Sequence, residues 1–131
     1  MEKLAACCFI QRPGDGSILA VSRGRTVHDW GLPGGSVEPG EPVVTGAERE
    51  LWEETGVKLG HDAYLAPIAE GPSFTHFVTI FEVVGDLIFP GELKSVPFEG
   101  YVAWVPPTTL IAPQCRFSDF QRRLFEGLGV I

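Results

Sequence analysis

The ten residues at positions 31–40 constrain the fold of this chain more than any other segment. They include four glycines and two prolines, a density that favours tight turns over regular secondary structure. We therefore expect a tightly folded loop here. A helix is predicted to follow from about Pro42 to Thr55, because proline suits the first helical position and Gly56 suits the residue just past the end.

Two strands are predicted before this loop, at residues 4–10 and 18–22, with a Pro-Gly-Asp-Gly turn signal between them at 13–16. This arrangement is typical of a β-hairpin. The first strand is apolar on both faces, so we expect other elements to cover both sides of the sheet. Its two faces are Ala5, Cys7 and Phe9 on one side and Ala6, Cys8 and Ile10 on the other.

Further strands are predicted after the helix, near residues 63–69 and over 74–84 and 101–105. Ser118 and Gln121 form a capping-box pattern at the start of a C-terminal helix. The order of the elements predicts an α+β or α/β sandwich, with a mixed β-sheet between helices. The apolar stripe expected on the C-terminal helix is Phe117, Phe120, Leu124 and Leu128.

Composition and charge exclude several classes of protein. With 131 residues, 44% of them apolar, the chain is long enough for one compact domain, which we expect to span residues 1–131. A net charge of −7 argues against a nucleic-acid polymer or a membrane as a partner, so a polyanionic ligand would need metal ions as bridges. The three cysteines do not make a disulfide framework, and no apolar run approaches the length of a membrane span. We expect an unprocessed cytoplasmic protein, either a monomer or a homodimer.

An acidic stripe marks the predicted helix. Glu50, Glu53 and Glu54 are spaced i, i+3 and i+4 and therefore share one face. The last helical turn disfavours carboxylates, because the negative end of the helix dipole lies there, and only Arg49 is placed to offset them. A solvated acidic face is the ordinary interpretation, but mutually repelling carboxylates in this position favour a divalent-cation site. The neighbouring stripe, expected to pack on the sheet, is Val44, Ala47 and Leu51.

The residue types of this stripe indicate which metal it would hold. Clustered oxygen ligands favour Mg²⁺ or Mn²⁺ over zinc, and the three histidines lack the spacing of zinc ligands. Gly34, in the loop before the helix, could add a backbone carbonyl to the site, because glycine lets the chain approach a metal closely.

Residues 35–57 carry a motif much longer than the usual short signatures. Gly35, Glu41 and residues 49–57 follow the pattern G-x5-E-x7-R-E-U-x-E-E-x-G-U, in which U is aliphatic, at all nine specified positions. This pattern resembles the signature of the Nudix hydrolase family. A motif of this length carries a far lower risk of a chance match than short motifs do. The chain length and the two strands before the motif are also similar to small, MutT-like members of the family.

The resemblance implies a fold, a reaction and a set of roles. It implies an α/β/α sandwich that hydrolyses nucleoside diphosphates linked to another group, with Mg²⁺ held by Glu50, Glu53 and Glu54. Arg49 and Glu41 then orient the loop and the helix. Catalysis is assigned to Glu50, Glu53 and Arg49, with Glu50 as our first choice of general base. A base outside the motif is common in the family and stays an alternative.

Two groups of residues outside the motif are candidates for contacts with metal and phosphate. Glu99 precedes the strand at 101–105, where Nudix hydrolases often place a carboxylate that joins the metal site; an exposed loop residue is the alternative. Arg23 and Arg25 follow the second strand, and a guanidinium fits phosphate oxygens in bidentate fashion. One of these two arginines is expected only to be solvated.

Four further residues are candidates for contacts with a nucleobase. Trp30, before the loop, and Phe74 and His76, at the start of the long strand, could line a base pocket by stacking, with core packing as the alternative. Asp119, in the first turn of the C-terminal helix, could meet the edge of a base as in MutT-like enzymes, or could simply complement the helix dipole.

The resemblance leaves the substrate open. The segment from His76 to Trp104 looks like the branch of the family that cleaves a nucleoside triphosphate to the monophosphate and pyrophosphate. Pro72, fifteen residues after the motif, is similar to the proline of relatives that cleave ADP-ribose, so ADP-ribose or a nucleotide sugar is the alternative substrate. A non-catalytic Nudix-like module that senses a nucleotide is a further alternative, although it would not need three repelling glutamates.

Overall fold

The computed structural model describes residues 3–22, 28–93 and 100–131, which form strands around two longer helices. Every predicted strand and helix is present to within a few residues at its start; the strand predicted at 63–69 runs on to Ser73. Short strands at 30–31, 34–36, 58–59 and 87–88 were not predicted. The strands are β1 (Lys3–Phe9), β2 (Ile18–Ser22), β3 (Trp30–Gly31), β4 (Gly34–Ser36), β5 (Lys58–Leu59), β6 (Tyr64–Ser73), β7 (His76–Val84), β8 (Leu87–Ile88) and β9 (Val102–Val105). The helices are α1 (Val43–Thr55), α2 (Pro107–Leu110) and α3 (Ser118–Leu128).

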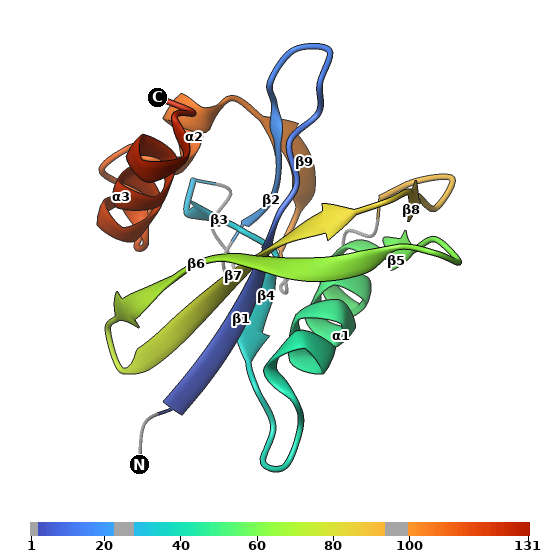
Figure 1. Cartoon of the computed structure of the whole chain (residues 1–131). Helices are drawn as coiled ribbons and strands as arrows, with labels where there is room; N and C mark the ends of the chain where they lie inside the picture. The colour runs from blue at the N-terminus through green and yellow to red at the C-terminus, as the bar shows by residue number, and fades with distance from the viewer. Residues whose placement is uncertain (1–2, 23–27, 94–99) are drawn as a thin grey trace.

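The strands form one main sheet and two smaller ones (Figure 1). The main sheet has the order β4-β1-β7-β6; β1 runs parallel to β7, and the other two pairs are antiparallel. The second sheet has the order β3-β2-β9, and β5 pairs with β8. The main sheet is therefore mixed, as expected.

The predicted hairpin between β1 and β2 forms only next to its turn. Gln11 and Ile18 make an isolated bridge, and the N–H of Leu19 donates to the carbonyl of Ile10 at 2.9 Å. Beyond these residues the strands separate into different sheets, because β1 pairs with β4 and β7 while β2 pairs with β3 and β9. A turn signal fixes the reversal of the chain and leaves open the partners that longer-range pairing offers each strand.

The glycine-rich segment is not wholly a loop, which corrects the expectation for residues 31–40. Gly34–Ser36 pairs antiparallel with β1, and Gly34 is opposite Cys7. A Cβ at Gly34 would lie 2.5 Å from Cys7 Sγ and 2.7 Å from Cys7 Cα, so the close approach of the two strands itself requires glycine.

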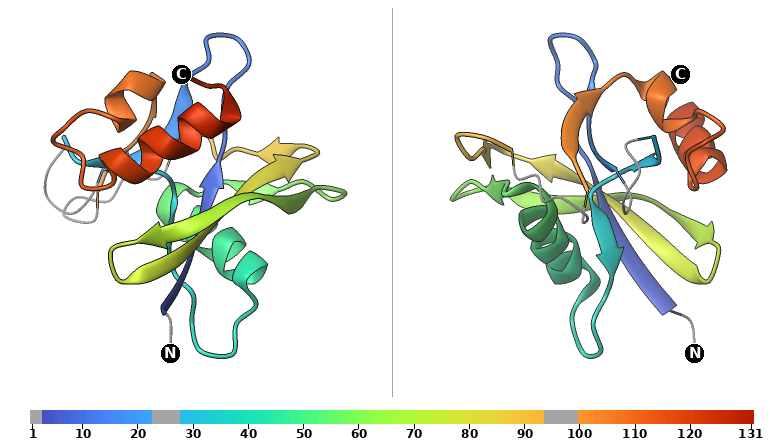
Figure 2. Two further views of the ribbon diagram at one scale, coloured as in Figure 1. Left: turned by 60° about the vertical axis from the view of Figure 1, so that its left-hand side comes forward. Right: turned by 180° about the vertical axis from the view of Figure 1, so that it is seen from behind.

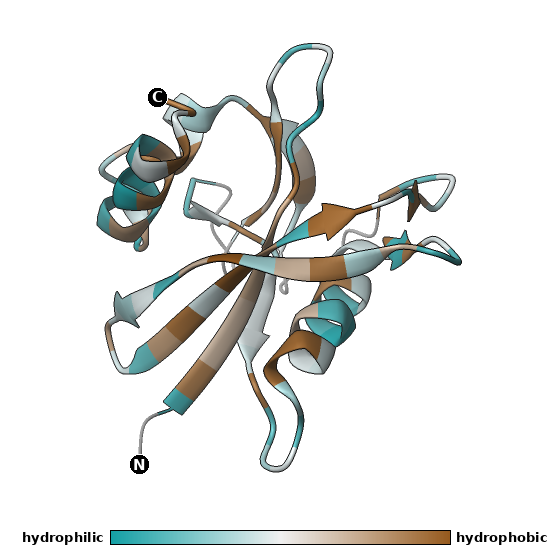
Figure 3. Cartoon of the chain, viewed as in Figure 1, coloured by the Kyte–Doolittle hydropathy of each residue, from teal (hydrophilic) through white to brown (hydrophobic). Residues whose placement is uncertain are grey.

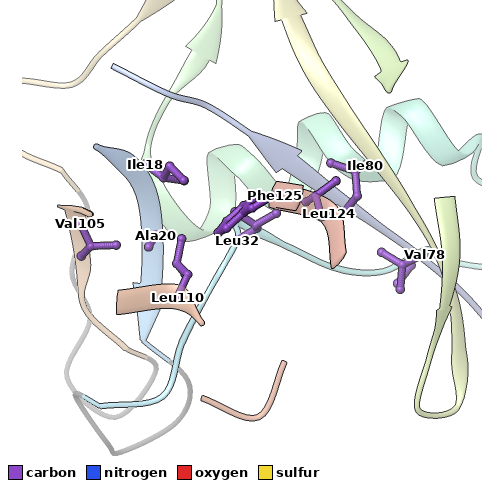
Figure 4. Packing of buried hydrophobic residues seen from close by; sticks show 10 residues of the cluster. Ile18, Ala20, Leu32, Val78, Ile80, Val105, Leu110, Leu124 and Phe125 are labelled. Atoms are coloured by element: carbon purple, nitrogen blue, oxygen red, sulfur yellow. The ribbon is translucent and has the colours of Figure 1, made fainter. Parts of the chain in front are cut away.

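The two faces of β1 belong to two separate cores, as its alternation predicts. Ala5 packs in the cluster that includes Leu124 and Phe125 of α3, and Ala6 packs in the cluster that includes Leu51 of α1. Figures 1 and 2 show α1 and α3 on opposite sides of the strands. This arrangement confirms the expected sandwich of helices around a mixed sheet. Figure 3 shows apolar residues along the central strands, and Figure 4 shows how the cluster beneath α3 packs.

Helix α1 begins and ends close to its predicted limits. Pro42 is the residue before the helix rather than its first residue, and Gly56, with a φ of 80°, ends it by donating its N–H to the carbonyl of Trp52. Ala47 is buried as expected, but Val44 is 40% exposed. Val43 packs against the core in its place, because the apolar face of the helix is rotated relative to the predicted stripe.

Helix α3 differs more from its prediction. Ser118 makes no capping bond, and the side chain of Gln121 is buried and donates to the carbonyl of Leu110. Leu124 is buried and Phe120 packs against the core, as expected, but Leu128 is 37% exposed and the fully buried Phe125 was not part of the predicted stripe. None of the helices in the described ranges is long and apolar enough to cross a bilayer.

Candidate active site

The carboxylates of α1 reach the glycine strand β4. Glu54 Oε1 accepts the N–H of Gly34 at 2.6 Å. The Glu50 carboxylate lies against Gly35, where a Cβ would come within 2.8 Å of Glu50 Cδ and Oε1. Glu50 and Glu54 are one helical turn apart and contact adjacent residues of β4, so both carboxylates face the same strand.

Arg49 connects the acidic residues to one another. Its guanidinium makes a bidentate pair with Glu41, at 2.9 Å from Nε and 3.0 Å from Nη2. Nη1 donates to Glu50 Oε1 at 3.0 Å and to Glu53 Oε2 at 3.2 Å, and Nη2 donates to the carbonyl of Ser36 at 3.2 Å. The hydrogen bonds to Glu41 are the largest cause of a raised pKa of Arg49. The Arg49 guanidinium therefore stays charged at every pH at which the protein would act.

The same pair also perturbs Glu41. Its pKa is lowered, first by the hydrogen bonds from Arg49 and then by the backbone N–H of Glu38, which donates to Glu41 Oε1 at 3.1 Å. Glu41 precedes α1, and its pair with Arg49 thus links the segment before the helix to the middle of the helix. Arg49 is held by a residue outside the acidic stripe while it faces Glu50 and Glu53.

These contacts explain how three acids are tolerated in the last two turns of α1. Arg49 offsets Glu50 and Glu53, and the N–H of Gly34 partly offsets Glu54. Among the described residues no three His, Cys, Asp or Glu side chains converge as metal ligands. The N–H of Gly34 contacts the acidic residues through Glu54, and the expected role of the Gly34 carbonyl as a metal ligand stays a prediction.

A pocket of about 500 Å³ lies between the main sheet and the start of α3. Gly34 and Gly35 form part of its wall, so this segment contacts both the pocket and the carboxylates of α1. The walls are largely apolar. The remaining lining residues are Ala5, Cys7, Leu32, Ser36, Ser73, Phe74, Thr75, His76, Val78, Ile80, Arg116, Phe117, Phe120 and Gln121.

Of the residues expected to contact the base, Phe74 and His76 line this pocket. His76 also has side-chain partners. Its Nε2 lies 3.0 Å from Ser36 Oγ, and its Nδ1 lies 3.0 Å from Thr75 Oγ1. Trp30 is partly buried and packs against the core, as the alternative for this residue had it. Asp119 is exposed and is not part of the pocket wall.

Three expected residues lie outside the described part of the chain. These are Glu99 as a metal ligand and Arg23 and Arg25 as phosphate contacts. Their roles stay predictions.

Sequence reasoning missed Phe117 and Gln121 as pocket residues. Both were assigned to the structure of the C-terminal helix, Phe117 to its apolar stripe and Gln121 to its cap. The available signal was Gln121 itself, because a glutamine beside the apolar stripe of a helix has to find polar partners or a ligand when it is buried.

The fold and this site define a class of protein, and comparison with known proteins identifies it. The family model of the NUDIX domain matches residues 1–128. The chain therefore belongs to the Nudix hydrolase family, as residues 35–57 predict.

Curated relatives match part of this chain. The chain is 34% identical over 85 residues to human 8-oxo-dGDP phosphatase NUDT18, and the matched region covers 64% of this chain and 26% of that protein. It is 34% identical over 90 residues to rat diphosphoinositol polyphosphate phosphohydrolase 2, covering 65% of this chain and 50% of that protein. The matches thus span between a quarter and a half of the length of these relatives.

Solved structures match over nearly the whole chain. The MutT NUDIX hydrolase of Burkholderia pseudomallei has a TM-score of 0.63 at 24% identity, covering 94% of this chain and 97% of the other. A structure from a study of MutT from Aliivibrio salmonicida and Vibrio cholerae has a TM-score of 0.68 at 18% identity, covering 97% of this chain and 99% of the other. At these identities the likeness shows the fold.

Proposed function

We propose that this protein is a Mg²⁺-dependent hydrolase that cleaves a nucleoside triphosphate or deoxynucleoside triphosphate to the monophosphate and pyrophosphate. One observation carries the proposal: Gly34 and Gly35 contact Glu54 and Glu50 while forming the wall of an apolar pocket. A base in the pocket would place its phosphates at this segment, within reach of the acidic face of α1.

The donor set fits a hard divalent cation. Carboxylate oxygens are the ligands that Mg²⁺ and Mn²⁺ prefer. Glu50, Glu53 and Glu54 would hold the metal, joined by Glu99 if the loop before β9 brings it there. A bound Mg²⁺ would neutralise phosphate oxygens and lower the pKa of an attacking water. The chain itself holds Glu50 against Gly35 and orients Glu50 and Glu53 through Arg49, with Glu50 proposed as the base that accepts the proton.

The apolar lining of the pocket favours a nucleoside over a diphosphoinositol polyphosphate, the compound in the name of the rat relative. An inositol polyphosphate would need several cationic side chains, whereas Arg116 is the single Arg or Lys among the pocket-lining residues in the described ranges. Apolar and aromatic walls suit a base. This agrees with the name of the relative NUDT18, an 8-oxo-dGDP phosphatase, which refers to a nucleoside diphosphate.

Pro72 does not line the larger pocket, so its position does not favour ADP-ribose as the substrate. Pro72, which suggested that alternative, lies in β6 and lines a separate cavity of about 270 Å³ between β6 and α3. The residue thus has no contact with the larger pocket that would tie it to a second nucleoside.

Cysteines that form no disulfide fit a reducing compartment, and we propose the cytoplasm. Burial is the first cause of a raised pKa of Cys8, to about 12. A thiol in this state is a packing residue rather than a nucleophile.

The proposal is tested by incubating the protein with Mg²⁺ and a panel of nucleoside triphosphates, diphosphates, ADP-ribose and nucleotide sugars. Products are separated by anion exchange. We expect a nucleoside monophosphate together with pyrophosphate from at least one triphosphate, and no turnover after chelation of the metal. Turnover of ADP-ribose alone, or of none of these compounds, would refute the proposal.

A further inference from the structure

The side-chain amide of Gln121 is fixed in one orientation at the pocket. Its Nε2 donates to the main-chain carbonyls of Leu110 and Trp30, at 2.5 and 3.4 Å. Both carbonyls are acceptors, so the nitrogen has to face them and the amide cannot rotate without losing both bonds. Only 2% of Gln121 is exposed, and the residue lines the pocket.

This arrangement leaves Oε1 of Gln121 as the amide atom available to a ligand. In the described part of the chain, no donor reaches this oxygen. The surrounding wall is apolar, with Leu32, Ile80 and Phe120 among its residues. A buried acceptor without a donor costs free energy, and a ligand that brings an N–H group to the pocket would supply the missing hydrogen bond.

Two aromatic side chains at the same pocket indicate the shape of that ligand. Phe74 is 74% exposed and has a φ of 51°, a conformation that residues other than glycine seldom adopt. Its ring meets Phe117 edge to face, with 5.6 Å between centroids, and both rings line the pocket. An exposed aromatic platform of this kind binds flat rings by stacking.

We propose that Gln121 determines base selectivity, with its Oε1 accepting a hydrogen bond from an amino group on the base. The inference rests on the proposed function and deepens it. Because the amide is locked, its oxygen attracts an amino group and repels a carbonyl at the same position of the ring. The protein is therefore expected to prefer the amino member of a matched pair of bases, adenine over hypoxanthine or cytosine over uracil.

The first test compares adenosine with inosine triphosphate, and cytidine with uridine triphosphate, in the wild-type protein. We expect kcat/KM to favour the amino member of at least one pair by about 5- to 150-fold, the range for leaving a buried polar group without its partner. Equal values in both pairs, or a preference for the carbonyl member, would overturn the inference while leaving the proposed hydrolase activity intact.

The second test is a change at the residue itself. In Gln121→Met, a side chain of similar length lacks the acceptor, and the amino-to-carbonyl ratio is expected to fall to about 1. Arg122→Ala, an exposed position on the same helix, is the control and should keep the wild-type ratio. A ratio unchanged in Gln121→Met would mean that the residue is only structural.

A binding measurement separates this inference from the activity. Adenosine, inosine, cytidine and uridine are titrated into the metal-free wild-type protein and followed by NMR or calorimetry. We expect tighter binding of the amino member of one pair. This comparison decides the inference even if Gln121→Met does not fold or if no nucleotide is hydrolysed, and equal binding within both pairs refutes it.

Discussion

The carboxylate of Glu50 packs directly against the backbone of Gly35. A methyl group at Gly35 would lie 2.8 Å from both Cδ and Oε1 of Glu50 and 3.0 Å from Oε2, so the carboxylate occupies the space that a side chain would fill. Glu50 Oε1 also accepts a hydrogen bond from Arg49 Nη1 at 3.0 Å. The position of this carboxylate is thus set by the absence of a side chain on β4 and by one guanidinium.

Gly35→Ala is expected to displace Glu50 and to leave the fold intact. The new Cβ meets the far end of a flexible side chain, which can move away at little cost in stability. A shift of about 1 Å in a group that acts in the reaction can lower the rate by about 100-fold. We expect kcat to fall by about that factor, measured under saturating substrate, with an unfolding temperature close to that of the wild type.

Gly34→Ala is the matched control, one residue away. Its Cβ would meet the Ala6 carbonyl and the Cα of Cys7, which are backbone atoms of β1 that cannot move aside. This variant should lose stability, seen as a lowered unfolding temperature. If Gly35→Ala keeps the wild-type kcat, the position of Glu50 does not matter for catalysis.

Glu54→Gln is expected to abolish turnover while the protein stays folded. The amide oxygen of glutamine can still accept the N–H of Gly34, and removal of a negative charge from the last turn of α1 relieves repulsion with the helix dipole. As a proposed metal ligand, however, residue 54 would no longer carry the negative charge that attracts the cation. Thermal unfolding should show equal or higher stability, and kcat/KM should fall by at least about 100-fold. Wild-type turnover in this variant would exclude Glu54 from the metal site.

Arg49→Lys is expected to impair the site although the charge is kept. Lysine cannot reproduce the bidentate pair with Glu41 while also reaching Glu50 and Glu53. Loss of such an orienting contact typically costs about 10- to 100-fold in activity or metal affinity. The measurement is the Mg²⁺ concentration that gives half-maximal rate, together with kcat. A change in neither would show that Arg49 does not orient the carboxylates.

Asp119→Ala is expected to leave base selectivity unchanged. Asp119 lies in the first turn of α3 but is exposed and is absent from the pocket wall. Its favourable interaction with the helix dipole is worth less than about 1 kcal/mol. The ratio of kcat/KM for a guanine and a cytosine nucleoside triphosphate should match that of the wild type. A shifted ratio would bring Asp119 back into the binding site.

The elements that the sequence predicted well are those decided by local physics. The alternation of β1 predicted its two cores, and Gly56 predicted the end of α1, because side-chain period and left-handed backbone are local properties. The partner of β2 is decided by which strands meet in three dimensions, so a turn signal alone gave the wrong sheet. Strand β4 was not predicted for a related reason. Its glycine residues allow it to lie close to β1, and this pairing cannot be read from a local sequence pattern.

The candidate site divides in the same way. The spacing of Glu50, Glu53 and Glu54 could be read from the sequence because all three lie on one helix. The role of Arg49 in offsetting Glu50 and Glu53 could be read in the same way. The pocket could not, because its walls come from β1, β4, β7 and the start of α3, which are distant in the chain. Gln121 looked like a helix cap, and only the carbonyls of Leu110 and Trp30 show that its side chain turns inward.

The stability of the protein is expected to depend on pH through Glu41. Its pKa is lowered in the folded state, chiefly by Arg49, so ionised Glu41 contributes stability above the ordinary carboxyl range. That contribution is lost as the pH falls through the lowered pKa, where the folded protein takes up the proton. The unfolding temperature of wild type and Glu41→Gln is therefore compared from about pH 7 to about pH 3. We expect the wild type to be more stable near neutrality and the difference to shrink in acid, whereas a difference constant across this range would show that the charge of Glu41 contributes nothing.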